Sequence, residues 1–318
     1  MYESLLELDP IKINFSNSGS FILNIVLAFV MFGVALGIRP GQFKALILSP
    51  KPVVVGLLSQ FIALPLITFL LVFLLGDFIT PTVAMGMILV ASCPGGNISN
   101  FMSSLSKANT ELSVTLTAFS TGLAVFMTPF NFSFWGGLYV KYVNNRETAR
   151  AMLQPLEIEF GQMFETIFII LGIPLVLGIL CSRYLPKIAD RLKKPLQYLS
   201  ILFFIAMVVV MFANNWNLFI RYIHYIFIIV LVHNLIALFT GYGLATLFKQ
   251  PDRNRRTITI ETGIQNSGLG LVLLFNPKIF PPELAIGGML FITAWWGIWH
   301  IVSGLSISAY WARKPVKE

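Results

Sequence analysis

The stretch from Thr257 to Pro277, TITIETGIQNSGLGLVLLFNP, decides the fold class of this chain. It is long and apolar enough to cross a bilayer, yet it carries Glu261 and then a run of glycines and amides over residues 263–270. A carboxylate at membrane depth is costly and usually functional. Irregular backbone survives there only inside protein or beside a watery cavity. The stretch therefore predicts a transmembrane helix that breaks at a binding site, with a kinked helix and a snorkelling glutamate as the simpler alternative.

The composition is that of a polytopic membrane protein. Of the 318 residues, 56% are hydrophobic and 11% are charged, and the mean hydropathy is +0.80. A soluble domain of this size does not need so much apolar surface. We attribute the net charge of +8 to cytoplasmic loops facing a lipid bilayer, and we expect no nucleic-acid partner. The acidic N-terminus, MYESLLELDPIKI, is not expected to be a signal peptide.

The hydrophobic segments predict about nine transmembrane helices. Each segment has roughly 20 residues or more, as a ~30 Å hydrocarbon core requires. Charged residues are absent from their interiors except for Glu261. We therefore expect an all-α polytopic membrane protein with spans at about 19–38, 52–76, 81–105, 110–131, 165–182, 196–215, 219–248, 256–277 and 284–312.

The basic residues predict the orientation of these spans. With the N-terminus outside and the C-terminus in the cytoplasm, sixteen of the twenty-two Lys and Arg residues fall in cytoplasmic loops. Basic loops are retained in the cytoplasm, so this orientation is favoured. The membrane would be the inner (cytoplasmic) one if the chain is bacterial. The connection 132–164 is expected to be external and interfacial, with Trp135, Tyr139 and Tyr142 as aromatic anchors.

Two halves, 1–131 and 165–318, flank that connection and share a pattern. The third span carries CPGGNISN at 93–100, and the eighth carries ETGIQNSG at 261–268. Both runs interrupt apolar sequence, and in the predicted topology they enter the membrane from opposite sides. Paired breaks in antiparallel halves indicate inverted repeats with a binding site where they cross. Close helix packing through glycine is the alternative explanation for each break by itself.

Oxygen-bearing side chains accompany the two breaks. Ser113 and Thr117 are four residues apart and share a helix face, although such hydroxyls also bond to their own helix backbone. With Ser99, Asn100 and Glu261 they supply hydroxyl, amide and carboxylate oxygens, which suit a hard cation. The predicted spans contain no Lys or Arg at depth to pair with the carboxylate, which leaves a cation or a proton.

Patterns typical of enzymes are missing from the sequence. It has no His/Cys cluster with metal-ligand spacing, no Walker glycine loop and no G-x-S-x-G motif. Cys93 and Cys181 lie in apolar runs and are not expected to form a disulfide. We therefore expect no catalytic residues and no enzymatic activity.

The motifs resemble those of the bile acid:sodium symporter family. The resemblance rests on the run 93–100, on Ser113 and Thr117, and on Glu261–Gly270, and it extends to Met31–Gly33 and to Trp299–His300. It implies a core domain in which two broken helices cross and a panel domain that moves against it. The core would hold spans two to four and seven to nine, and the panel would hold spans one, five and six.

The resemblance also implies two sodium sites that share one carboxylate. The first site would use Ser99, Asn100, Ser113, Thr117 and Glu261. The second would use Gln60, Glu261 and Gln265, with main-chain oxygens of Thr262 and Ile264. The substrate would lie near Asn97, Asn266 and His300. Asn97 replaces a Thr that is frequent in relatives, and Ile301 replaces an Asn found in some, so substrate identity stays open.

The sequence thus predicts a secondary active transporter that couples two sodium ions to the uptake of an organic anion by alternating access. The anion would be bile-acid-like or a small carboxylate. One alternative is a proton-coupled antiporter or exporter on a similar fold, with Glu261 as the proton carrier. The others are an intramembrane enzyme, for which no nucleophile or metal set is visible, and a sensor that binds a solute without transporting it.

Overall fold

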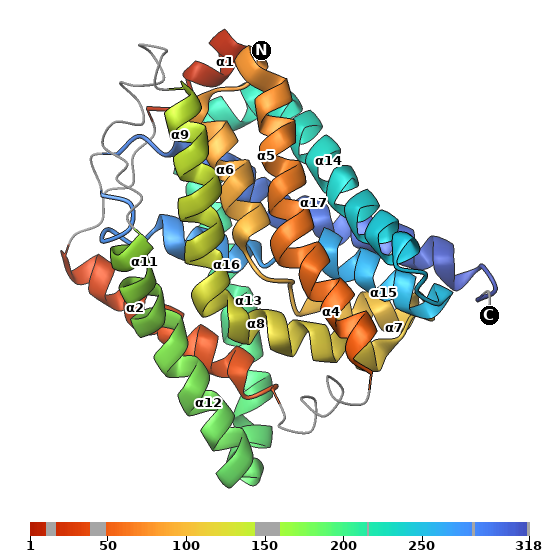
Figure 1. Ribbon diagram of the computed structural model, residues 1–318. Coiled ribbons are helices and arrows are strands. Elements are labelled where there is room, and N and C mark those ends of the chain that lie inside the picture. Colours follow the sequence, from red (N-terminus) through yellow and green to blue (C-terminus); the bar gives the residue numbers. More distant parts are fainter. Residues whose placement is uncertain (11–16, 39–48, 144–159, 215, 282–283, 317–318) are drawn as a thin grey trace.

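The computed structural model describes residues 1–10, 17–38, 49–143, 160–214, 216–281 and 284–316. Within these ranges the secondary structure is helical, and the β-type interaction is an isolated bridge between Gly95 and Gln265. The helices lie against one another as a bundle (Figure 1). The predicted all-α class is therefore confirmed.

Helices occur where the apolar segments predict them. A short helix, α1 (Tyr2–Leu6), precedes the first span. π-helical turns join successive helices: η2 (Ser59–Ala63) joins α4 to α5, and η5 (Phe168–Gly172) joins α11 to α12. The bounds are α2 (Asn17–Ala35), α4 (Pro50–Leu58), α5 (Leu64–Leu75), α8 (Thr110–Asn131), α11 (Phe160–Ile167), α12 (Ile173–Tyr184), α13 (Pro186–Asn214), α14 (Trp216–Leu247) and α17 (Gly287–Ala312).

Two of the predicted spans are broken. The segment expected at 81–105 forms α6 (Pro81–Ser92) and α7 (Ile98–Leu105), and the segment expected at 256–277 forms α15 (Asp252–Gly263) and α16 (Ser267–Leu274). A proline removes a backbone donor and glycines weaken a helix, which explains the first break. The second break follows from a glycine at the end of α15 and an asparagine N-cap at the beginning of α16.

Several helices are suited to a bilayer. Among the described residues, four helical segments are long and apolar enough to cross it, and α6 and α12 are shorter apolar helices. Large side chains on these surfaces are exposed, such as Leu74 (80%) and Phe239 (70%), as expected of lipid-facing positions. The chain is therefore an integral membrane protein. The four segments are Pro50–Phe78, Thr110–Val143, Phe219–Leu247 and Gly287–Ala312.

The helix expected to end at residue 131 is longer than predicted. α8 continues through the π-helical turn η4 (Phe132–Gly136) into α9 (Gly137–Val143). Trp135 packs against Phe69 with ring centroids 5.2 Å apart. The three aromatic anchors expected in the connection 132–164 thus lie on a helix, and no proline interrupts the chain between Pro129 and Val143. The middle of that connection, residues 144–159, and the predicted cytoplasmic loop 39–48 lie outside the described residues.

The helix expected at 196–215 begins earlier, at Pro186. Proline is favoured in the first turn of a helix because its missing N–H has no partner there in any case. Lys193, Lys194 and Pro195 therefore extend the helix rather than precede it. The sequence predicts a beginning at about 196 because the segment free of charged residues begins after Lys194.

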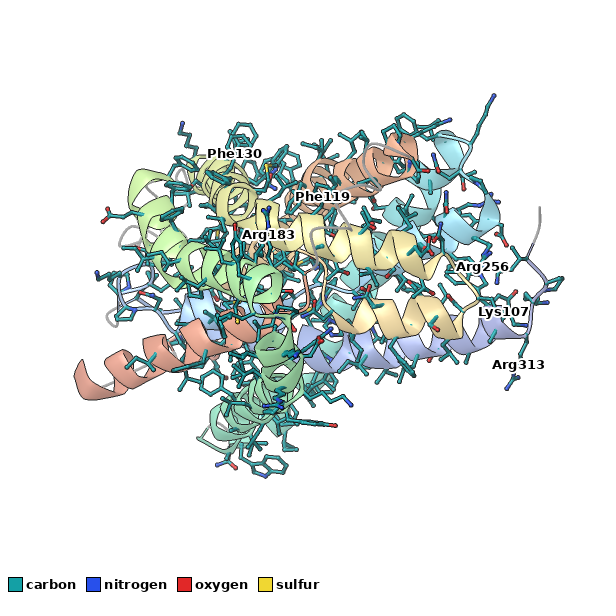
Figure 2. The ribbon with its side chains drawn as sticks, turned by 90° about the horizontal axis from the view of Figure 1, so that it is seen from below. Lys107, Phe119, Phe130, Arg183, Arg256 and Arg313 are labelled. Atoms are coloured by element: carbon teal, nitrogen blue, oxygen red, sulfur yellow. The ribbon has the colours of Figure 1, made fainter. Side chains whose placement is uncertain are left out.

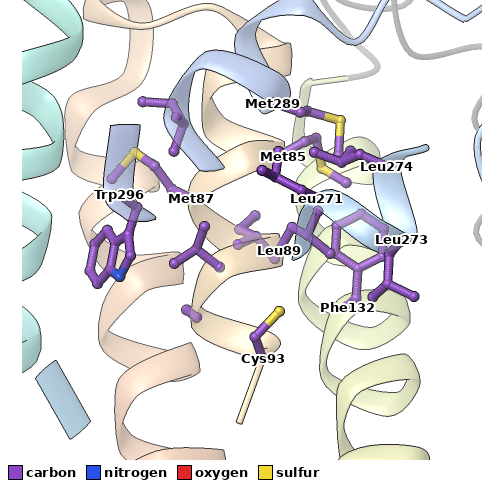
Figure 3. Close-up of a cluster of buried hydrophobic side chains, with 14 of the residues drawn as sticks. Met85, Met87, Leu89, Cys93, Phe132, Leu271, Leu273, Leu274, Met289 and Trp296 are labelled. Atoms are coloured by element: carbon purple, nitrogen blue, oxygen red, sulfur yellow. The ribbon is translucent and has the colours of Figure 1, made fainter. Parts of the chain in front are cut away.

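The centre of the molecule is formed by α6 and α17, which pack closely. Gly86 permits this approach, because a Cβ atom there would lie 2.8 Å from the Cα of Met289. α16 packs against both helices through buried apolar side chains (Figure 3). The labelled members of this cluster are Met85, Met87, Leu89, Cys93, Phe132, Leu271, Leu273, Leu274, Met289 and Trp296.

The remaining helices form two groups. α2 packs with α12 and α13, while α14 packs along α15 (Figure 1). Gly178 of α12 lets α2 approach, since a Cβ there would lie 2.9 Å from the main-chain oxygen of Phe32. α8 meets α11 at an aromatic contact between Phe126 and Phe164, with ring centroids 5.2 Å apart.

One buried carboxylate lies outside the spanning segments. Asp9 Oδ1 accepts hydrogen bonds from Thr80 Oγ1, at 2.9 Å, and from Thr82 Oγ1. The main-chain oxygen of Asp9 accepts from the N–H of Gly287 at 3.4 Å. Burial raises the pKa of the Asp9 carboxyl to about 6, although the two hydroxyl donors oppose this. Asp9 therefore joins the N-terminal segment to the beginnings of α6 and α17, where helix dipoles favour negative charge.

Candidate functional site

The two breaks cross and hydrogen-bond to each other. The N–H of Gly96 donates to the main-chain oxygen of Ile264 at 2.7 Å, and the N–H of Asn266 donates to that of Pro94 at 2.8 Å. These bonds form the isolated antiparallel bridge. Backbone groups released by the ends of α6 and α15 are therefore satisfied by the opposite break, as membrane depth requires.

Glycine is needed at the crossing for close approach. A Cβ atom on Gly95 would lie 2.9 Å from Glu261 Oε2, and one on Gly96 would lie 3.0 Å from the main-chain oxygen of Gln265. The first distance is shorter than real Cβ contacts show, and the second is tighter than nine in ten of them. The run predicted to break the helix thus also makes room for the carboxylate beside it.

The Glu261 carboxylate collects hydroxyl groups from two other helices. Ser99 of α7 and Ser113 of α8 each donate to Oε1 at 2.5 Å. Thr117 Oγ1 lies 3.2 Å from both carboxylate oxygens and 3.3 Å from Asn100 Oδ1. The five residues of the first predicted cation site therefore lie together.

The electrostatics of this cluster favour an additional positive charge. Glu261 is 4% exposed and lies in the last turn of α15, where the helix dipole adds negative potential. No Lys, Arg or His in the described part of the chain forms an ion pair with it. A buried charge without a partner costs several kcal/mol. The surrounding hydroxyl and amide oxygens are suitable ligands for a hard cation.

A second polar cluster adjoins the first. Gln60 Nε2 donates to the main-chain oxygen of Cys93 at 2.9 Å and to Gln265 Oε1 at 2.8 Å. Gln265 Nε2 donates to the main-chain oxygen of Thr262 at 2.7 Å. The Ile264 oxygen accepts from the first break, as described above. The members of the second predicted site are thus neighbours, with the two glutamines bonded to each other.

The residues predicted to bind the substrate are placed less closely together. Asn97 is exposed at the beginning of α7, and Asn266 is half-buried at the beginning of α16. Asn266 Oδ1 caps α16 by accepting from the N–H of Leu269 at 3.0 Å. His300 is buried in α17, and the structure describes no hydrogen bond between it and either asparagine.

This chain is similar to a known family of transporters. The Sodium Bile acid symporter family matches residues 24–222, which is more than half of the chain. The uncharacterized sodium-dependent transporter YocS of Bacillus subtilis (strain 168) is 31% identical over 94% of this chain and 85% of its own length. The chain belongs to this family. The resemblance expected from the motifs is confirmed.

Other similar proteins are longer, so this chain covers a smaller share of each of them. The sodium-dependent organic anion transporter of Mus musculus is 29% identical over 91% of this chain and 73% of its own length. The P3 protein of Homo sapiens is 31% identical over 82% of this chain, which spans about half of that protein (52%). The relatives named for a function are transporters, so the expectation of a transporter rather than an enzyme is also confirmed.

Sequence reasoning missed several polar groups of the crossing. Ser59 Oγ lies 2.7 Å from Thr262 Oγ1. Asn131 and Asn234 each donate to a main-chain oxygen next to the second cluster. Their signal in the sequence was a polar side chain inside an apolar span, which does not by itself indicate its partner. His233 Nε2 lies 2.9 Å from Thr68 Oγ1, so this buried histidine is hydrogen-bonded within the bundle.

Proposed function

We propose that this protein is a secondary active transporter that couples the inward movement of sodium to the uptake of an organic anion. The observation that carries the proposal is the buried Glu261 carboxylate, surrounded by hydroxyl and amide oxygens where two broken helices cross. Membership of a family of sodium-dependent transporters supports sodium as the coupling ion.

The first sodium ion would bind between three helices. Ser99, Ser113 and Thr117 supply hydroxyl oxygens, Asn100 supplies an amide oxygen, and Glu261 supplies the charge. The hydroxyl hydrogens now point to the carboxylate and would rotate away when the oxygens ligate a cation. The ion thereby holds α7, α8 and α15 together.

The second sodium ion would bind at the glutamine pair. Gln60 and Gln265 use their amide groups on each other and on main-chain oxygens of Cys93 and Thr262. A cation there would replace the contact between the glutamines, with amide oxygens, main-chain oxygens of Thr262 and Ile264 and the shared Glu261 around it. Both ions would share the one carboxylate, so its negative charge would offset part of the repulsion between them.

The organic anion would bind beside the crossing. α7 and α16 both begin there, and the beginning of a helix favours an anion. Asn266 caps α16 with its oxygen and retains its amide N–H groups as donors. Asn97 lies exposed at the matching position of α7, and His300 would complete the site. Asn266→Ala should weaken substrate binding more than sodium binding.

The two helix groups would move against each other to give alternating access. The panel would consist of α2, α11, α12 and α13, and the core of α4 to α8 and α14 to α17, with the halves 1–131 and 165–318 as inverted repeats. Support comes from the packing of α2 with α12 and α13 and from that of α14 with α15; the two groups also touch where α13 meets α14. The Phe126–Phe164 contact would close one side of the core–panel boundary.

The basic end of the bundle would face the cytoplasm. Lys107, Arg256 and Arg313 lie toward one side of the molecule, whereas Arg183 lies apart from them and nearer to Phe130 (Figure 2). Arg256 donates to the main-chain oxygens of Ser106 and Trp311, so the ends of α7 and α17 meet the beginning of α15. The N-terminus would then be outside. Cysteines introduced at positions 141 and 193 test this, because an impermeant thiol reagent should label the first and spare the second in whole cells.

Transport by the purified protein in liposomes tests the proposal directly. Uptake of a bile acid and of small carboxylates should require an inward sodium gradient and stop when choline replaces sodium. Sodium should also raise the thermal stability of the protein, because a ligand that binds the native state stabilises it. Uptake that ignores sodium and follows a pH gradient would establish the proton-coupled alternative instead. Binding without uptake would make the protein a sensor.

A further inference from the structure

A proline disturbs the helix that carries Gln60. Pro65 has no N–H group, so the main-chain oxygen of Phe61 loses the donor that a regular helix would provide four residues later. The helix responds with the π-helical turn η2, in which the N–H of Leu64 reaches back to the oxygen of Ser59. Asn131 Nδ2 then donates to the Phe61 oxygen at 3.0 Å. An asparagine of α8 thus replaces the missing backbone donor.

The same arrangement occurs at the second break. α15 ends at Gly263, and the N–H of Ser267 bonds to the oxygen of Gln265 at 3.0 Å rather than continuing the helix. The Gly263 oxygen therefore lacks a helical donor. Asn234 Nδ2 of α14 donates to it at 2.8 Å. Asn234 is fully buried, and its Oδ1 has no partner among the described residues, so the Gly263 oxygen sets the direction of this amide.

These two main-chain oxygens border the proposed second sodium site. Phe61 follows Gln60 in the chain, and Gly263 lies between Thr262 and Ile264. We infer that Asn131 and Asn234 are positioning residues of this site. Each holds one oxygen away from the site and thereby directs the neighbouring Gln60 side chain or the neighbouring main-chain oxygens toward it. The inference rests on the proposed function, because it concerns how that site is built.

The packing of α14 makes the second hydrogen bond rigid. Gly241 lies two helical turns after Asn234 and therefore shares its face. A Cβ atom on Gly241 would lie 2.8 Å from the Ile258 oxygen and from the Thr259 Cα, so α14 and α15 touch through their backbones. Because the two backbones are in contact, α14 cannot shift to compensate for a change in the amide at position 234. Such a change must therefore alter the end of α15.

The first test removes each amide donor. Asn131→Leu and Asn234→Leu keep the approximate size of the side chain, and both should raise the half-saturating sodium concentration about three- to tenfold, the range for one lost hydrogen bond. The substrate KM at saturating sodium should change less than twofold. Sodium-titrated uptake in liposomes and sodium-titrated thermal unfolding measure both quantities. An unchanged half-saturating concentration in both variants would overturn the inference.

A matched control separates positioning from general stability. Asn109 is the N-cap of α8 and accepts from the N–H of Leu112 at 3.1 Å, at the opposite end of the helix from Asn131. Asn109→Ala should lower the Tm without changing the half-saturating sodium concentration. An equal change in sodium dependence in this control would show that any loss of stability weakens sodium binding, which would also overturn the inference.

A second substitution adds a pH-dependent measurement, and it tests the inference even if the leucine variants fail to fold. Asn234→Asp cannot donate to the Gly263 oxygen when ionised but can when protonated. Its sodium affinity, relative to the native protein at each pH, should therefore recover as the pH falls. A constant ratio across pH 5–8 would contradict the inference. Glu261→Gln, measured in parallel, separates a failure of the proposed sodium site from a failure of the positioning role. If Glu261→Gln keeps native sodium dependence, the proposed site itself is wrong.

Discussion

Glu261 and Asp9 are two buried carboxylates with similar hydrogen-bond donors and different surroundings. Glu261 is 4% exposed and lies within reach of three hydroxyl groups, while Asp9 is 1% exposed and accepts from two. Asp9 lies where α6 and α17 begin, so the positive ends of two helix dipoles offset its charge. Glu261 lies where α15 ends, so the dipole of its own helix adds to its charge.

This difference separates an anchor from a binding site. The protein itself supplies the groups that partly offset the charge of Asp9, through two hydroxyls and the beginnings of two helices, although burial still raises the pKa of this carboxyl. At Glu261 the hydroxyl oxygens can either donate to the carboxylate or ligate a cation together with it, and the helix end favours the second arrangement. Substitution of the two carboxylates should accordingly affect different properties.

The largest effect is expected for Glu261→Gln. This change keeps the size of the side chain and removes the charge that both proposed ions would share. Sodium-driven uptake should fall at least about 100-fold, in line with the roughly 3–5 kcal/mol lost when one partner of a buried charge pair is removed. Asp9→Asn should retain native sodium dependence within about twofold. Equal losses of sodium dependence in the two variants would remove the distinction between them.

The next effect concerns Asp9 and the pH dependence of stability. The folded pKa of about 6 is above the model-peptide value of 3.8, so the folded state binds the proton more tightly. The contribution of the protonated Asp9 carboxyl to the free energy of unfolding is fully present below about pH 4. This contribution, roughly 3 kcal/mol, is lost as the pH rises through 6. Thermal unfolding between pH 4 and 8 should show this decrease in the native protein. The decrease should be smaller in Asp9→Asn. Superimposable profiles of stability against pH for the two proteins would refute the role of Asp9.

The smallest effect compares two hydroxyls on α8. Ser113 donates to Glu261, whereas Thr115 donates to the Glu111 oxygen of its own helix at 2.8 Å. Ser113→Ala should raise the half-saturating sodium concentration about three- to tenfold, as expected for one ligand or hydrogen bond. Thr115→Ala should leave it unchanged. Sodium-titrated thermal unfolding measures both, and an equal response would mean that the position of the hydroxyl is irrelevant.

Local signals were sufficient to predict where most helices lie and where two of them break. Hydrophobic length sets where helices lie, and Pro94 with Gly95 and Gly96 marks the first break in the sequence. The cost of a buried charge singled out Glu261, and helical spacing placed Ser113 and Thr117 on one face. These oxygens lie together in the structure as expected.

Features that depend on a neighbouring helix could not be predicted in this way. The turn η2 is needed because Pro65 removes a donor, but only the tertiary structure shows that Asn131 replaces it. Asn234 likewise finds the Gly263 oxygen through the packing of α14 on α15. The extension of α8 to Val143 was missed because aromatic residues near a span end fit both a helix and an interfacial loop.

The hydrogen bonds between the two breaks also have a consequence for biosynthesis. Pro94 and Gly96 bond to residues near the end of the chain, Asn266 and Ile264. While the ribosome is still making the second half, these backbone groups of the first break have no partner, and unpaired groups are not tolerated in hydrocarbon. The first break must therefore stay near water or an insertion factor until α15 and α16 have been synthesised. Insertion of the two halves is thus a single assembly event, completed only when the later segment arrives.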